Sequence, residues 1–526
     1  MASSLRPETA DKLGLKGRPL IIVLTIACGL GQFLHGYDNG VLGGLLTAPS
    51  FIDQFHLSAA LEGTVTALFQ AGCALGCFAT SLLSVRFGRL TLTHTGSLCI
   101  CVGGALQASS FTSGQLMAGR VIAGIGLGMI TSSVSVLQSE TAPARIRGRL
   151  IAMSLSSLLV GQLLAYWLDY GMNAYTTDIS WRFPLSFQAV IALIMSGLLL
   201  FMPECKSNIR SLARKALTFS APRWLCQRGR EAEALKVIMR LRNKDRDDPA
   251  VILEVAEIQA AIELDRHQSG WRDLVRKDAV QTRTRVALAC MVMSMNPFSG
   301  STAISYYTTV IFQISIGMTR HTALLTSGFL QLWFLFASLG TWILIEFAGR
   351  RRMFMVSAVG MAIAMTVLAA TLATGSHAAS IVAAAMIFVY QAFYTWGWMA
   401  GVWTYTPELL PLKYRAKGMG LASTCVYGLT FMILEVVPIA IHNIHWKVFI
   451  LFAVFNACFV PITYFLLPET AGLSLEAIDL VFTDPDTSSV KKAKALRKSG
   501  EDMHLREVHL DDVEIISATP GVKGDN

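Results

Sequence analysis

The sequence predicts an all-α membrane protein with twelve transmembrane helices, and three observations support this fold class. The 526 residues are 53% hydrophobic and only 15% charged, with a mean hydropathy of +0.51, whereas an average soluble domain is roughly a quarter charged. The apolar residues gather in stretches of about twenty, the length at which a helix crosses the hydrocarbon core of a bilayer. The basic residues gather in alternate turns between these stretches, which is how membrane topology is encoded.

Twelve apolar stretches are long enough to cross a membrane, and their boundaries are predicted to within a few residues. Because the number of spans is even, both chain termini lie on the same side of the membrane. The predicted spans are 19–46, 59–84, 91–111, 115–138, 150–171, 183–202, 285–313, 322–345, 353–374, 379–405, 416–440 and 446–467.

The charges in the turns decide which side that is. Clusters of Arg and Lys occupy one set of turns, whereas the opposite set contains only Arg182, Arg320 and Lys447. The positive-inside rule makes the basic set cytoplasmic, so both termini are predicted to be cytoplasmic. The basic clusters lie at 86–89, 145–149, 350–352 and 413–417.

Polar segments divide the chain into five parts. One separates the first six spans from the last six, and another follows the last span. The predicted parts are a cytoplasmic N-terminus (1–18), a six-helix bundle (19–202), a cytoplasmic central loop with short helices (203–284), a second six-helix bundle (285–467) and a cytoplasmic, largely disordered tail (468–526).

Residues 205–221 of the central loop have a second interpretation. The possible codons for Glu204 to Ser207 contain a nucleotide sequence that is common at intron starts, and those for Phe219 to Ala221 contain one that is common at intron ends. Removing the nucleotides between these two points would restore the sequence Pro-Glu-Ser-Pro-Arg-Trp-Leu in frame. The hypothesis is that 205–221 is a retained intron in the gene model, and the alternative is a genuine basic loop on the inner membrane surface.

The two halves of the chain repeat three landmarks in the same order. A Gly-Arg pair recurs, then a Glu followed seven residues later by an Arg, then a Pro-Glu pair. A parallel repeat of this kind implies two six-helix bundles that face each other, with the solute site between them near the membrane midplane. The matched pairs are Gly88-Arg89 with Gly349-Arg350, Glu140 and Arg147 with Glu408 and Arg415, and Pro203-Glu204 with Pro468-Glu469.

A longer set of short motifs runs in order through the chain. It consists of Gly36 to Gly40, Arg86 to Arg89, Gly119-Arg120 to Gly128, Glu140 with Pro143 and Arg147-Gly148, Trp181-Arg182 with Gln188, Pro222 to Leu225, Gly349 to Arg351, Glu408 with Pro411 and Arg415 to Gly418, and Pro468 to Thr470 with Gly472 to Glu476. As an ordered set, these residues resemble the sugar porter family of the major facilitator superfamily, in a fungal-like form.

The resemblance implies the major facilitator fold, in which a pseudo-two-fold axis relates two six-helix bundles. It implies a transporter and not an enzyme, moving a sugar or sugar-like solute by alternating access, with carbohydrate:proton symport as the leading mode. A facilitative sugar uniporter and a non-transporting nutrient sensor are the alternatives. The implied partners are a sugar or polyol, a proton and the lipid bilayer, without cofactor, metal or nucleic acid. We expect a monomer in the plasma membrane.

The chain departs from the family where the solute binds. Asn296, Pro297 and Thr302 occupy places where the family usually has paired glutamines and an asparagine, and Leu155 replaces another glutamine. A hydroxyl-rich ligand needs dense donors and acceptors, because each unpaired buried polar group costs roughly 1–3 kcal/mol. The departures leave open a less hydroxylated or partly apolar solute.

Asp38 and Arg120 are ionisable residues at membrane depth, which makes them functional candidates by default. They lie about eight and about five residues from the outer ends of their spans, so at about 1.5 Å per residue they are at similar depths. One hypothesis is proton coupling, in which Asp38 binds a proton when it separates from Arg120. The resemblance agrees with it, and the alternative is a static ion pair. His35, three residues before Asp38, lies on the same helix face and is predicted either to tune that proton or to satisfy a local hydrogen bond.

The resemblance also implies solute-binding and gating residues. Trp403 aligns with a tryptophan that lines the family's cavity, where a ring stacks on an apolar face of the solute; a lipid-interface anchor is the alternative. Tyr306 and Tyr307 resemble the outer gate, with core packing as the alternative. Pro297 and Gly300 should weaken their helix, as discontinuous transporter helices require. The other candidate solute-binding residues are Asn296, Ser299, Thr302, Tyr427, His35 and Gln162.

Charged residues at the cytoplasmic ends form an inner lock by analogy with the family. Arg89 is expected to pair with Glu140, and Arg350 or Arg351 with Glu408, while two further arginines brace the halves. The complete set is Arg89, Glu140, Arg147, Glu346, Arg350, Arg351, Glu408 and Arg415.

Gly124, Gly126 and Gly128 match the spacing of a nucleotide-binding fingerprint. That fingerprint follows a strand, whereas these residues lie within an apolar helix. We therefore interpret them as positions of close helix packing.

Overall fold

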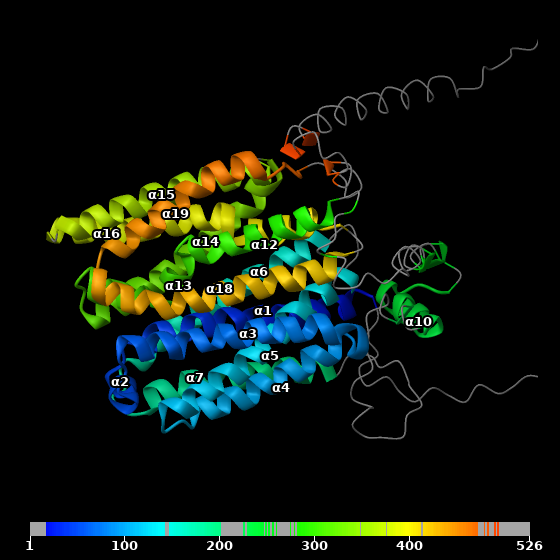
Figure 1. Ribbon diagram of the computed structural model, residues 1–526. Coiled ribbons are helices and arrows are strands. Elements are labelled where there is room, and N and C mark those ends of the chain that lie inside the picture. The colour runs from blue at the N-terminus through cyan, green and yellow to red at the C-terminus, as the bar shows by residue number, and fades with distance from the viewer. Residues whose placement is uncertain are drawn as a thin grey trace, which may run out of the picture.

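The computed structural model describes residues 17–141, 147–200 and 281–471 apart from 348, 375, 412 and 413, together with short pieces of 225–278 and 478–493. All regular secondary structure in that part of the chain is helical. Figure 1 shows two bundles of roughly parallel rods packed side by side.

The first bundle contains six long helices and one short one. The short helix α2 (Pro49–Phe55) caps the outer end. The long helices are α1 (Arg18–Leu45), α3 (Ala59–Phe87), α4 (Arg89–Ala108), α5 (Ser113–Thr141), α6 (Arg147–Met172) and α7 (Ile179–Leu200).

The second bundle also contains six rods, two of which are interrupted. One is α12 (Thr282–Phe298), α13 (Ser301–Val310) and η3 (Ile311–Ser315), and the other is α16 (His377–Tyr394), η4 (Thr395–Met399) and α17 (Ala400–Leu409). The continuous helices are α14 (Arg320–Phe347), α15 (Arg350–Thr374), α18 (Arg415–Ile444) and α19 (Lys447–Leu466).

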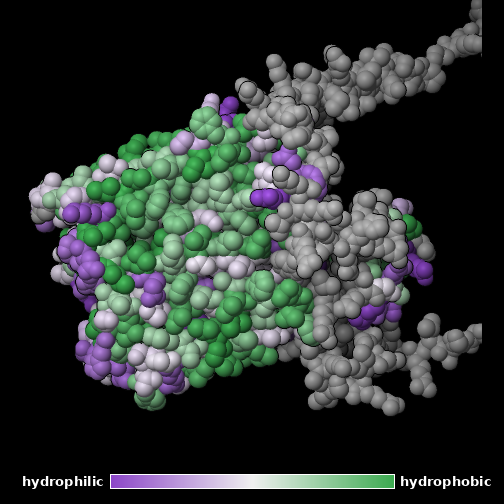
Figure 2. All heavy atoms as spheres, viewed as in Figure 1, coloured by the Kyte–Doolittle hydropathy of each residue, from purple (hydrophilic) through white to green (hydrophobic). Residues whose placement is uncertain are grey.

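The predicted spans agree with these rods, and no end differs by more than four residues. Within the described residues, nine rods are long and apolar enough to cross a membrane. The other three are α4, α6 and the interrupted α12–η3 rod, whose longest helix has 17 residues. Figure 2 shows a hydrophobic surface along the sides of the bundles and hydrophilic residues at the end that carries α2. This distribution is the one a bilayer requires.

The central loop contributes α10 (Glu231–Arg242), whose apolar face buries Ala234, Val237, Ile238 and Leu241. The backbone N–H of Gly17 donates to the carbonyl of Arg240 at 2.8 Å, so α10 is attached to the start of α1. Residues 205–221 lie outside the described residues, as do most of the central loop and of the tail, so the intron hypothesis and the domain limits there stay predictions.

The three spaced glycines of α5 do serve helix packing, as predicted. A Cβ atom at Gly124 would lie 2.2 Å from the Phe69 carbonyl, and one at Gly126 would lie 2.4 Å from the Gly96 carbonyl. At Gly128 the nearest atom is another carbonyl of α3 at 2.2 Å. In a membrane such small residues let backbones approach and gain van der Waals contact, so α5 is held directly against α3 and α4.

Replacing Gly124 with Val should destabilise the first bundle by about 1–3 kcal/mol, because the side chain overpacks the α3–α5 contact. The matched control is Gly197→Val on α7, where a Cβ would meet nothing within 4 Å. Thermal unfolding of the detergent-purified proteins measures both, and equal losses in the two variants would contradict the packing argument.

Candidate functional site

A buried ion pair lies inside the first bundle. Arg120 Nη1 on α5 donates to both carboxylate oxygens of Asp38 on α1, at 3.0 and 3.1 Å. The Arg120 side chain is fully buried and that of Asp38 is 4% exposed. The guanidinium also lies over the Phe69 ring of α3, 4.4 Å from its centroid. The two residues singled out for their depth are therefore in direct contact.

On α1 and α3, the residues that follow Asp38 and Phe69 contact the other bundle. The Tyr306 hydroxyl on α13 donates to Asn39 Oδ1 on α1 and accepts from Gln70 Nε2 on α3 at 2.5 Å. Asn39 follows Asp38, and Gln70 follows Phe69. One turn of α1 therefore carries both Asp38 and a contact to the predicted gate tyrosine, and one turn of α3 carries both the ring under the Arg120 guanidinium and the second contact to that tyrosine.

Further polar contacts join the bundles toward the end that carries α2. The Tyr166 hydroxyl on α6 donates to the Ser305 carbonyl at 2.7 Å, and Thr64 Oγ1 on α3 donates to Glu435 Oε1 on α18 at 2.6 Å. The second gate candidate, Tyr307, is buried and donates to the Leu434 carbonyl of its own bundle at 2.9 Å. Several polar contacts therefore join the bundles on the side that the charge pattern assigns to the outside.

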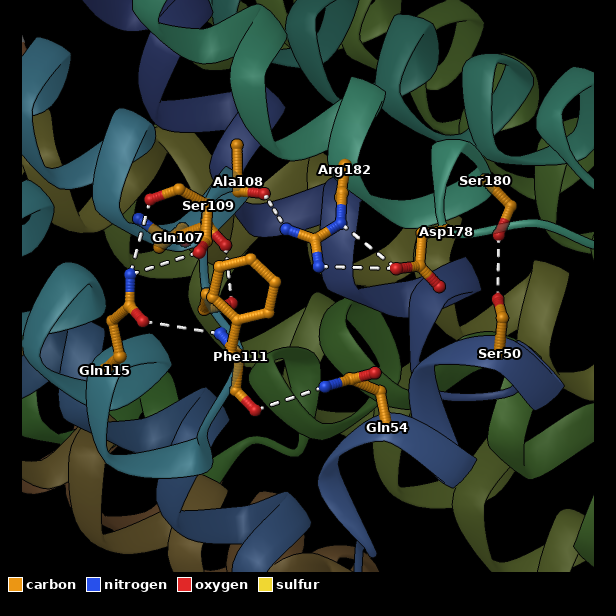
Figure 3. A network of polar contacts seen from close by, with 11 residues as sticks. Ser50, Gln54, Gln107, Ala108, Ser109, Phe111, Gln115, Asp178, Ser180 and Arg182 are labelled. Carbon is orange, nitrogen blue, oxygen red and sulfur yellow. Dashed lines mark hydrogen bonds and ion pairs between the residues drawn. The ribbon is translucent and has the colours of Figure 1, made fainter.

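A separate network of polar contacts joins residues of the first bundle at the end that carries α2 (Figure 3). Arg182 at the start of α7 donates to the Ala108 carbonyl at 2.8 Å and pairs with Asp178 at 3.3 Å. Ser50 of α2 bonds Ser180 at 2.9 Å. These contacts tie α2, the end of α4 and the start of α7 into one unit.

The predicted break in the seventh rod is present. Pro297 lies in the last turn of α12, and Gly300 has a φ of +92°, a left-handed conformation that favours glycine. The carbonyl of Ser299, freed by the break, accepts from the Tyr390 hydroxyl at 2.9 Å and from Asn456 Nδ2 at 2.8 Å. Two neighbouring helices therefore stabilise the interruption.

The predicted solute-binding groups at this break are partly used inside the bundle. Asn296 Oδ1 accepts from the Tyr394 hydroxyl at 3.2 Å, and the Ser299 hydroxyl donates to the Asn296 carbonyl at 2.6 Å. Thr302, in the first turn of α13, is only half-buried. Fewer hydroxyl-binding groups therefore remain for a solute than the sequence suggests.

The other solute-binding candidates come from both bundles. The rings of His35 on α1 and Tyr427 on α18 lie 6.0 Å apart between centroids, and both are buried. Gln162 on α6 is buried beside Gly40 of α1. Trp403 is half-buried on α17. The structure thus brings His35 and Tyr427 together across the two bundles, one turn from Asp38.

One pair of the predicted inner lock is present in the second bundle. Arg350 Nη2 pairs with Glu408 Oε1 at 3.2 Å, whereas Arg351 donates to the Tyr464 carbonyl at 2.5 Å. Arg350, and not Arg351, is therefore the partner of Glu408. Arg89 and Arg415 begin α4 and α18. The side chains of Glu140, Arg147 and Glu346 lie outside the described residues, so their pairings stay predictions.

Sequence reasoning missed several of these positions. Glu469 accepts from the backbone N–H groups of Arg350 and Arg351 at 3.0 and 3.1 Å, which stabilises the start of α15. Thr470 donates to Glu408 Oε2 at 2.6 Å. These two residues stood in a recognised motif without an assigned role. Asn39 and Gln70 were missed because only their position in space relates them to Tyr306.

The two donors to the Ser299 carbonyl should act as a unit. Removing one, by Tyr390→Phe or Asn456→Ala, leaves the other, whereas removing both leaves a buried carbonyl unpaired at a cost of about 1–3 kcal/mol. We therefore expect the double variant to lose more unfolding free energy than the two single losses combined. Unfolding of the purified proteins measures this, with the exposed Tyr464→Phe as the control. Simple additivity would contradict a shared role.

Comparisons with known proteins agree with this arrangement. The family described as "Sugar (and other) transporter" matches residues 23–482. "Sugar transporter STL1" of Saccharomyces cerevisiae is 30% identical over 95% of this chain and 87% of its own length. A "Quinate permease" of Neurospora terricola is 29% identical over 85% of this chain and 86% of its own.

Solved structures share the fold. The proton:xylose symporter XylE bound to 6-bromo-6-deoxy-D-glucose superposes with a TM-score of 0.72 and 23% identity, covering 88% of this chain and 99% of its own. With the matched residues spanning most of the chain, the protein is a multi-pass membrane transporter of the major facilitator fold and belongs to the sugar (and other) transporter family.

Proposed function

We propose that the protein transports a sugar or sugar-like solute together with a proton by alternating access. The observation that carries this proposal is the adjacency of Asp38, paired with Arg120, and Asn39, bonded to Tyr306 of the other bundle. A proton-binding group and a gate contact thus occupy consecutive residues of α1. The names of the relatives, a sugar transporter and a proton:xylose symporter, support the same class of reaction.

The proposed cycle follows from the charge of Asp38. In a dry interior an ionised carboxylate is stable only beside a counter-charge. When Asp38 is ionised it binds Arg120, the two bundles meet at Tyr306, and the outer side is closed. When the outer side opens, water and protons reach Asp38, and protonation removes its attraction to Arg120. In this proposed cycle, the Asp38–Arg120 pair belongs to the state after proton release to the inside.

The solute is proposed to be smaller or less hydroxylated than a typical hexose. Support comes from the internal use of Asn296 and Ser299 and from the approach of His35 to Tyr427. Each hydroxyl of a buried solute needs a partner, and few groups remain to supply one. Short polyols of three or four carbons and ring acids such as quinate therefore belong in the panel beside hexoses and pentoses.

The topology and inner lock are proposed on charge grounds. Basic clusters in alternate turns favour cytoplasmic termini, and the plasma membrane is the proposed location. Glu140, Arg147 and Glu346 are proposed to complete the lock with Arg89 and Arg415. We further propose that the protein acts as a monomer.

Asp38→Asn should abolish proton-driven accumulation, because Asn cannot carry the proton. Uptake of the radiolabelled panel, measured in cells without their own sugar carriers, should fall to the level seen with a protonophore. Asp178→Asn, on an exposed outer carboxylate, is the matched control and should behave as the parent.

The alternatives give different results. Accumulation that survives both Asp38→Asn and the protonophore identifies a uniporter with a structural ion pair. Absence of uptake for every solute in the panel, with the protein present at the cell surface, shifts the assignment to another solute or to a sensor.

Tyr306→Phe should weaken the coupling between proton binding at Asp38 and the contact between the bundles, because the ring stays while both hydrogen bonds of the hydroxyl are lost. Downhill uptake should persist, whereas the accumulation ratio should fall several-fold, as expected when about 1–2 kcal/mol of coupling is removed. Gln70→Ala should act in the same direction. The control is Tyr175→Phe on an exposed ring, and an unchanged ratio in Tyr306→Phe would contradict the link.

A further inference from the structure

An acidic side chain is buried in the first bundle apart from the Asp38–Arg120 pair. Asp169 on α6 is 4% exposed, and its Oδ2 accepts from the backbone N–H of Gly44 on α1 at 3.2 Å. A Cβ atom at Gly44 would lie 2.6 Å from that oxygen, so the glycine is what lets the carboxylate sit against α1. One backbone hydrogen bond is poor compensation for a buried carboxylate.

An arginine of the other bundle binds on both sides of this acid. Arg320, the first residue of α14, donates through Nη1 to Asn173 Oδ1, in the turn after α6, and through Nε to Thr47 Oγ1, in the turn after α1, at 3.4 Å. Asn173 lies one turn beyond Asp169, and Thr47 one turn beyond Gly44. One cation of the second bundle therefore bridges the ends of both helices that surround the buried acid.

The position of Arg320 is unfavourable by local rules. A positive charge in the first turn of a helix opposes the helix dipole, and outer turns rarely carry basic residues in this chain. Neighbouring groups repeat the contact, since the Tyr170 hydroxyl bonds His321 Nε2 at 3.2 Å and Trp167 stacks edge-on against Phe329 at 5.7 Å. Arg320 keeps its hydrogen-bond partners Asn173 and Thr47 only while the ends of α6 and α14 stay together.

We propose that Arg320, Asn173 and Thr47, beside the buried Asp169, form an outer latch: hydrogen bonds from a charged side chain that join the bundles, hold the transporter closed to the outside and break when the outer side opens. Opening separates α14 from α6, and water replaces the two partners of Arg320. The latch sets the population of the outward-open state. It depends neither on the identity of the solute nor on proton coupling.

The test measures how fast a reagent outside the cell reaches a cysteine that is buried while the bundles are in contact. Thr66 on α3 is fully buried in this state, so a cysteine there reacts with a membrane-impermeant maleimide only when the outer side opens. The full-length Thr66→Cys protein is labelled in intact cells without solute, and the parent chain supplies the background from its native cysteines. We expect Arg320→Gln to raise the labelling rate roughly tenfold, the effect of losing one hydrogen-bonded charge.

Arg182→Gln is the matched control. Arg182 is also an outer arginine, but its partners Asp178 and Ala108 belong to its own bundle, so labelling should not change. Asn173→Ala should give a smaller increase and replaces Arg320→Gln should that variant fail to reach the membrane. An unchanged rate in whichever of these two variants reaches the membrane, or an equal increase in Arg182→Gln, overturns the latch.

Discussion

A bilayer offers no hydrogen bonds to the backbone, so every buried carbonyl and N–H must find its partner within the protein. The described spans satisfy this by being helical, and the two interruptions occur only where neighbours supply donors. Tyr390 and Asn456 bond the Ser299 carbonyl, and Thr341 donates to the Thr395 carbonyl at η4 at 3.0 Å. The breaks that permit movement are thus built from side chains of adjacent rods, and the candidate solute-binding residues cluster around them.

The same shortage of water makes buried charge costly unless it is paired. Arg120 lies against both the Asp38 carboxylate and the Phe69 ring, all within one bundle. Asn39 and Gln70, the next residues, contact Tyr306 of the other bundle. In the proposed cycle, a change of charge at Asp38 would therefore act directly on the backbone segments that hold Tyr306.

Local patterns predicted the fold well because hydropathy and turn charge are local properties. Depth counting along two helices was enough to suggest the Asp38–Arg120 contact, and analogy with the family suggested Arg350 or Arg351 as the partner of Glu408. The contacts of Tyr306 were beyond such reasoning, because they depend on the relative register of α1, α3 and α13. The pairing of Tyr394 with Asn296 was missed for the same reason, so solute-binding groups were assigned that the bundle partly uses itself.

Polar contacts within a bundle and between the bundles have different consequences for movement. The Arg350–Glu408 pair and the Glu469 contacts join parts of one bundle. Toward the end that carries α2, Tyr306, Glu435 and Arg320 bond across to the other bundle. Each such hydrogen bond contributes about 0.5–1.5 kcal/mol, and more where a charge takes part. Separating the bundles at that end must offset their sum, whichever step of the cycle supplies the free energy.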